Sequence, residues 1–92
     1  ASKNADVIYT DVWASMGQES EELKRKEKFK GYQVNENLLE TSKAIFMHDL
    51  PAHHGEEISE GLVDHNKSIV FDQAENRIWG QVGVIKYLMN LK

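Results

Sequence analysis

The sequence predicts an α/β fold, a three-stranded parallel sheet flanked by helices. Short β-branched or aromatic runs alternate along the 92 residues with longer segments of helical character, which is the order expected of a parallel sheet covered by helices. The apolar runs are continuous rather than alternating, as is typical of strands covered on both faces. Three strands make a thin sheet, so residues 1–92 are predicted to form one small domain or a fragment of a doubly wound domain.

Three short apolar runs are predicted as buried strands, over residues 7–9, 44–47 and 68–71. Each is rich in Val, Ile, Tyr or Phe and is followed by polar residues. Pro51 has no backbone N–H to donate to a sheet, so the second strand must end before it.

Helices are predicted between and after these strands. A polar helix over residues 20–31 begins with acidic residues and ends with basic ones, which complements the helix dipole. Asn35 is placed to cap a short helix over residues 37–39. A final helix over residues 75–91 carries an apolar stripe at helical spacing, made up of Ile78, Val82, Ile85 and Met89.

The composition argues against several classes of function. The formal charge is −4, which gives no attraction for nucleic acid or an anionic membrane. Basic residues cluster between Lys24 and Lys30, but glutamates alternate with them, so a solvated helix face is expected. The chain has no cysteine, which excludes a disulfide framework and a thiolate nucleophile. Because no apolar run approaches the length of a membrane span, a cytoplasmic protein is expected.

Polar residues follow each of the three predicted strands, over residues 11–17, 48–57 and 72–77. Ligands of open parallel sheets bind at the carboxyl ends of the strands, so three such segments predict a ligand site where they meet. Each segment taken alone is also consistent with an ordinary structural role, as a turn, a proline-containing loop or the start of a helix.

These segments resemble the three hallmark segments of ornithine carbamoyltransferases. The residues that carry the resemblance are Asp11-x-x-x-Ser15-Met16-Gly17, the run from His48 through Leu50-Pro51-Ala52-His53 to Gly55-Glu56-Glu57, and Asp72-Gln73-Ala74-Glu75-Asn76-Arg77. Their order and spacing match over essentially the whole chain. The Ser-Met-Gly loop separates this family from aspartate carbamoyltransferases. The resemblance implies that the chain is the C-terminal portion of the Rossmann-like ornithine-binding domain.

The resemblance also implies an activity and its partners. The family transfers the carbamoyl group of carbamoyl phosphate to the δ-amine of ornithine in arginine biosynthesis, giving citrulline and phosphate, without a metal or organic cofactor. A carbamoyl-phosphate domain with a Ser-x-Arg-Thr signature precedes this region in the family. Since no such segment is present in these 92 residues, the isolated chain is expected to be inactive.

Five substrate-binding residues follow from the resemblance, and four of them precede Arg77 in the chain. Asp11 would bind the α-ammonium of ornithine. Ser15 and Met16 would hold the amino-acid end on a mobile loop that closes over it. Leu50 would position the carbamoyl amide through its backbone carbonyl.

Arg77, His48 and Asp49 are the predicted catalytic residues. Arg77 would also bind substrate, placing positive charge at the carbonyl oxygen of carbamoyl phosphate. An arginine at a helix start opposes the dipole, which independently favours a functional role. His48 would help to build the site. Asp49 departs from the family pattern, which has Cys there; a carboxylate would favour the cationic, non-nucleophilic form of the amine, so weaker catalysis is expected.

Other interpretations of the polar clusters are simpler. His48, His53 and His54 lack the i,i+4 spacing of a helical zinc site, so surface or loop histidines and no metal are expected. Glu56 and Glu57 are expected to form the acidic first turn of a following helix.

Two alternative functions stay open. One is a carbamoyltransferase for another amine such as putrescine, although Asp11 and the Ser-Met-Gly loop favour a substrate with an α-amino-acid head. The other is a non-catalytic folding module that self-associates through its terminal helix.

Overall fold

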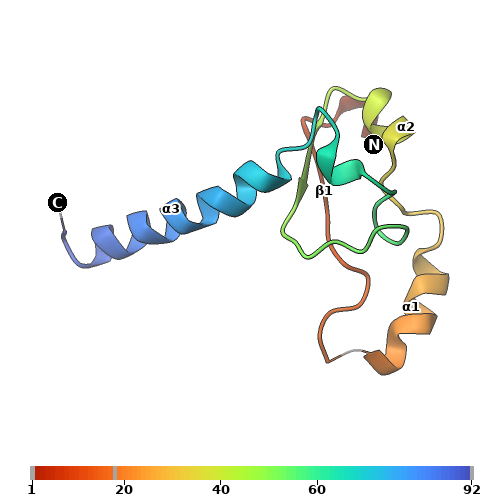
Figure 1. Ribbon diagram of the computed structural model, residues 1–92, viewed down its shortest axis with the longest axis horizontal. Helices are drawn as coiled ribbons and strands as arrows, with labels where there is room; N and C mark the ends of the chain where they lie inside the picture. Colours follow the sequence, from red (N-terminus) through yellow and green to blue (C-terminus); the bar gives the residue numbers. More distant parts are fainter. Residues whose placement is uncertain (1, 18, 92) are drawn as a thin grey trace.

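The computed structural model describes residues 2–17 and 19–91 and shows an α/β fold. Figure 1 shows a small body from which one long helix projects. Along the chain the elements are a 3-10 helix Ser2–Asn4, strand β1 Val7–Thr10, a 3-10 helix Glu19–Glu21, helix α1 Glu22–Phe29, helix α2 Glu36–Glu40, strand β2 Ile45–His48, a 3-10 helix Leu62–Asp64 and helix α3 Val70–Leu88.

The described residues form a two-stranded parallel sheet. β1 pairs with β2 in a register that sets Val7 opposite Ile45 and Thr10 opposite His48. Phe46 is completely buried, whereas Tyr9 is 53% exposed. The first two predicted strands are therefore confirmed, but the expectation that the strands are covered on both faces is wrong for this sheet.

The predicted third strand over residues 68–71 is wrong. Phe46 donates its N–H to Lys67 O at 2.8 Å and accepts from the N–H of Ile69 at 3.0 Å, which makes one bridge beside β2. The next backbone bond is already helical, from Gln73 N–H to Ile69 O at 2.8 Å. A short β-branched run does not separate strand from helix by itself, and here the helical pattern downstream extends back over it.

The long helix consequently starts earlier than predicted and includes the residues expected to precede it. α3 begins at Val70 and ends at Leu88, rather than spanning residues 75–91. Asp72, expected in a polar segment after the third strand, lies instead in the first turn of α3, where a carboxylate complements the helix dipole.

The other helix predictions are confirmed within one or two residues. Two i,i+4 ion pairs stabilise α1, one of them between Lys26 and Glu22 at 2.7 Å. Asn35 caps α2, since its side-chain oxygen accepts the N–H of Leu38 at 3.0 Å.

The core is small and lies beside β2. It consists of Val34, Leu39, Phe46, Ile58, Leu62, Val63 and Val70. α3 contributes Val70 to this core, and beyond its first turn it runs away from the body (Figure 1). The predicted apolar stripe is therefore exposed, with Ile78 at 61% and neighbouring Trp79 at 64%. Within residues 2–17 and 19–91, no helix is long and apolar enough to cross a membrane.

Candidate functional site

Gln73 ties α3 to the carboxyl ends of both strands. Its Oε1 accepts the backbone N–H of His48 at 3.1 Å, and its Nε2 donates to the hydroxyl of Tyr9 at 3.4 Å. His48 ends β2 and Tyr9 lies one residue before the end of β1. The first turn of α3 is therefore fixed at the edge of the sheet where ligands of parallel sheets bind.

A hollow of about 280 Å³ lies beside this junction. It is lined by Asp49, Gln73, Ala74 and Arg77. Two of the predicted catalytic residues, Asp49 and Arg77, thus face the same space although they come from different segments. Arg77 lies about two turns into α3 rather than at its start, so the argument from an opposed helix dipole does not apply to it.

His48 is buried, and both nitrogens of its ring are engaged. Nδ1 accepts the backbone N–H of Leu50 at 2.9 Å, so the ring proton is assigned to Nε2, which donates to Glu57 Oε1 at 2.9 Å. Asp49 Oδ1 lies 3.7 Å from Nδ1, but with no proton between them this approach is not an ion pair. The expectation of a surface or loop position is wrong for His48, whereas His53 and His54 are exposed loop residues.

The burial of Glu57 is the feature of this region that the sequence did not predict. Its side chain is completely buried, and its Oε1 also accepts the backbone N–H of His53 at 2.7 Å. Its Oε2 has no hydrogen-bond partner among the described residues. The predicted acidic helix start at Glu56 and Glu57 is wrong, because no helix follows until Leu62–Asp64.

The backbone between His48 and His53 is unusual. Leu50 adopts φ 58°, a left-handed conformation that is uncommon for a residue with a side chain, and its bond to Pro51 is cis. The half-buried Leu50 packs against the core beside β2. Its carbonyl is the group that the family resemblance assigns to the carbamoyl amide.

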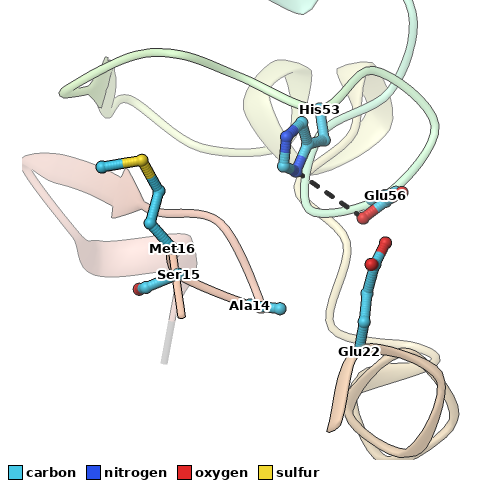
Figure 2. A pocket seen from close by; sticks show the side chains of 6 residues that line it. All are labelled: Ala14, Ser15, Met16, Glu22, His53 and Glu56. Atoms are coloured by element: carbon cyan, nitrogen blue, oxygen red, sulfur yellow. Dashed lines mark ion pairs between the residues drawn. The ribbon is translucent and has the colours of Figure 1, made fainter. Parts of the chain in front are cut away.

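A second hollow, of about 250 Å³, lies beside the Ser-Met-Gly loop. It is lined by Ala14, Ser15, Met16, Glu22, His53 and Glu56. Figure 2 shows His53 and Glu56 beside one another across this space from Ser15 and Met16, with His53 Nδ1 3.8 Å from Glu56 Oε2. The side chain of Met16 is 98% exposed, so this loop leaves an apolar group uncovered beside the hollow.

Lys26 forms ion pairs with two carboxylates that line this hollow, those of Glu22 and Glu56. Its ammonium lies 2.7 Å from a carboxylate oxygen of Glu22 and 2.7 Å from one of Glu56. The hydrogen bond to Glu22, and to a lesser extent that to Glu56, raises the pKa of Lys26 well above that of a free lysine. The pair with Glu56 joins α1 to the loop that follows β2.

Asp11 occupies a third place. Its carboxylate is exposed and accepts the N–H of Val12 at 2.6 Å. Asp11 and Trp13 line a hollow of about 420 Å³ together with residues of α1. Four of the predicted substrate residues, Asp11, Ser15, Met16 and Arg77, are therefore distributed over three hollows, and Asp11 does not share one with Ser15, Met16, Asp49 or Arg77.

One group of metal-ligating side chains comes together in the described part of the chain. Donor atoms of His53, Glu56 and Glu57 lie within 4.8 Å of one another. The two His53–carboxylate distances are 3.8 and 4.0 Å, wider than the separation of about 3.4 Å that tetrahedral zinc imposes on its ligands. Glu56 is also already paired with Lys26. That no metal takes part stays a prediction.

Comparison with known proteins gives a consistent result. The model of the aspartate/ornithine carbamoyltransferase family, Asp/Orn binding domain, matches residues 1–88. The ornithine carbamoyltransferase of Oceanobacillus iheyensis is 57% identical over 91 residues, which cover 97% of this chain and 28% of that protein. The anabolic ornithine carbamoyltransferase of Pyrococcus furiosus is 52% identical, covering 97% and 29%.

Solved structures give the same picture. The crystal structure of anabolic ornithine carbamoyltransferase from Campylobacter jejuni matches with a TM-score of 0.87 and 33% identity, covering 98% of this chain and 30% of that chain. The structure of the enzyme from Pyrococcus furiosus matches with a TM-score of 0.79 and 52% identity, covering 91% and 28%. The chain therefore spans less than a third of the length of these relatives.

Proposed function

This chain belongs to the aspartate/ornithine carbamoyltransferase family, and from that premise we propose that it is the C-terminal portion of the ornithine-binding domain of an ornithine carbamoyltransferase. The complete enzyme would transfer the carbamoyl group of carbamoyl phosphate to the δ-amine of ornithine. This reaction would take place in the cytoplasm, as a step of arginine biosynthesis. The observation that carries the proposal is the hollow at the carboxyl end of β2, where Asp49 and Arg77 face the same space.

Charge stabilisation is the role proposed for Arg77. When an amine attacks the carbamoyl carbonyl, negative charge develops on the carbonyl oxygen, and a guanidinium aimed at that oxygen lowers the barrier. Arg77 lies one helical turn after Gln73, whose hydrogen bond to His48 fixes the helix against β2. The cation would thus be held by an element that is itself anchored at the site.

Positioning is the role proposed for Leu50. Its backbone carbonyl would accept a hydrogen bond from the carbamoyl amide and orient the group for attack. The fixed backbone conformation at Leu50 and its hydrogen bond to His48 support this role.

Ornithine binding is proposed for the loop that follows β1. Ornithine carries its α-amino-acid head and its reactive δ-amine at opposite ends of a short alkyl chain, so the two ends need separate places. Asp11, Ser15 and Met16 lie in hollows other than that of Arg77, and the exposed Met16 leaves an apolar group for the loop to bring over the substrate. Closure of this loop would bring the head group and the reactive centre into one site.

A full-length chimera tests the proposal. In it, this chain replaces the matched 91 residues of the Oceanobacillus iheyensis ornithine carbamoyltransferase, to which it is 57% identical. We expect citrulline formation from ornithine and carbamoyl phosphate, and a higher rate with Asp49→Cys, because a neutral thiol does not stabilise the protonated amine. Absence of activity from a folded chimera in both forms would contradict the proposal. A preference for putrescine over ornithine would favour the related amine carbamoyltransferase.

A second proposed role is supported by the exposed face of α3. Apolar side chains with more than half of their surface exposed follow one another along this helix, Ile78, Trp79 and Ile85 among them. Exposed apolar side chains gathered on one helix are typical of an interface, and self-association of the chain through α3 is the form we propose. Sedimentation showing monomers at all accessible concentrations would contradict it.

A further inference from the structure

We infer that Glu57 is a positioning residue of the reactive centre, which acts through the buried ring of His48 on the backbone of Leu50. The inference rests on the proposed function, because it concerns how the carbonyl of Leu50 is held for the carbamoyl group. Glu57 does not line the hollow of Asp49 and Arg77, so its effect has to be transmitted.

The transmission runs through two hydrogen bonds on one rigid ring. Glu57 Oε1 accepts from Nε2 of His48 at 2.9 Å, and Nδ1 of the same ring accepts from Leu50 N–H at 2.9 Å. Both side chains are completely buried, so water does not compete for the bond between Glu57 and His48. Rotation of the imidazole would break both bonds at once. The carboxylate therefore fixes the ring, and the ring fixes the peptide plane that enters Leu50.

Glu57 also holds the far end of the same loop. The oxygen that accepts from His48 accepts from the backbone N–H of His53 at 2.7 Å. One carboxylate oxygen thus ties His48, two residues before Leu50, to His53, two residues after Pro51. The loop that presents Leu50 is closed on a single atom.

The conformation of Leu50 explains why such a clamp is needed. Its φ of 58° costs about 1 kcal/mol for a residue with a side chain, and such a conformation persists when its surroundings over-determine it. The hydrogen bond from Leu50 N–H to His48 is one of those constraints. Without it, Leu50 would relax toward a more common conformation and its carbonyl would turn away from its present direction.

The chemistry of Glu57 argues for a role beyond stability. Burying a carboxylate is costly, and an apolar residue of similar volume often stabilises a core equally well. Its second oxygen, Oε2, has no hydrogen-bond partner among the described residues, so this carboxylate is not optimally satisfied where it lies. A residue kept for positioning fits this arrangement better than one kept for packing.

Glu57→Leu and Glu57→Gln in the chimera described above test the inference. Leu removes the oxygen that accepts hydrogen bonds from His48 and His53. The kcat is therefore expected to fall about 10- to 100-fold, as is common when a reacting group is misplaced. The KM for ornithine should change less than about threefold, because the residues proposed to bind ornithine lie elsewhere. Gln keeps a carbonyl oxygen for His48 and His53, and kcat should stay within about threefold. Glu60→Leu, at an exposed carboxylate of the same segment, is the matched control.

The possible failures are distinguishable. A folded chimera that is inactive both with Asp49 and with Asp49→Cys would overturn the proposed function. An active chimera in which Glu57→Leu matches Glu60→Leu would overturn only this inference. If Glu57→Leu does not fold, Glu57→Gln decides, because a fall as large as 100-fold there would show that charge and not positioning matters. Nitrogen NMR of His48 adds a direct test: the inference requires the proton on Nε2, and a proton on Nδ1 would overturn it.

Discussion

Replacing Gln73 by Leu tests whether α3 is anchored to the sheet as described. The change removes the acceptor of the His48 backbone N–H, at 3.1 Å, and the donor to the Tyr9 hydroxyl, at 3.4 Å. His48 is buried, so its N–H would be left without a partner. If these two hydrogen bonds anchor α3, both the free energy of unfolding and the position of Arg77 depend on the Gln73 side chain.

The magnitude follows from the two bonds. An orphaned buried N–H costs about 1–3 kcal/mol, whereas the longer bond to the exposed Tyr9 contributes about 0.5 kcal/mol, at the weak end of the range. We expect Gln73→Leu to lower the free energy of unfolding by about 2–3 kcal/mol. For a chain of this size that corresponds to a fall in Tm of about 10–20 °C. Tyr9→Phe, which removes only the weaker bond, should cost about 0.5 kcal/mol.

Thermal unfolding followed by circular dichroism, with amide hydrogen exchange at His48, measures both parts of this prediction. Gln81→Leu on an exposed turn of α3 is the matched control and should change stability by less than about 0.5 kcal/mol. The reasoning is refuted if Gln73→Leu is as stable as Gln81→Leu and the His48 amide stays equally protected from exchange.

Three further predictions concern other parts of the chain. Lys67→Met should destabilise it by about 2 kcal/mol in urea unfolding, because the Lys67 ammonium donates to two carbonyls at the end of α2, at 2.6 and 2.7 Å, whereas exposed Lys43→Met should be near neutral. Hydrogen bonds to two glutamates raise the pKa of Lys26, so the stability lost in Lys26→Gln should be constant between about pH 6 and pH 10, the range in which free glutamate and lysine side chains are both charged, and vanish as pH rises further; a difference that vanishes near neutrality would contradict this. Ile85→Glu should weaken self-association at least about 10-fold in sedimentation without lowering Tm, since Ile85 is 53% exposed, and equal association of both forms would exclude α3 as the interface.

Local signals in the sequence were sufficient for most of the elements. The strand before Asp11, the helix rich in i,i+4 pairs and the Asn35 cap each depend on neighbours a few residues away, and each is present. The strand prediction for residues 68–71 was wrong because short runs of this composition occur in both strands and helices. Its single bridge to Phe46 depends on a contact that no local pattern encodes.

The candidate site was predictable to a similar extent. Asp49 and Arg77 do line one hollow, as expected of residues at the carboxyl edge of a sheet. The loop after β1 instead turns toward α1, where Trp13 stacks on Phe29 with ring centroids 5.9 Å apart, so its residues line separate hollows. The burial of Glu57 could not be predicted locally, since its neighbour has the same side chain and the burial depends on the loop folding back onto His48.

The measurement that tests the central claim most directly is citrulline formation by the chimera carrying Arg77→Gln. Lys86→Gln, at an exposed cation on the same helix, is the control. If Arg77 stabilises charge at the carbamoyl oxygen, kcat should fall by about 100-fold or more in the first variant and stay within about twofold in the second. A folded Arg77→Gln chimera that keeps the activity of the Lys86→Gln chimera would show that the hollow beside Asp49 is not the reactive centre.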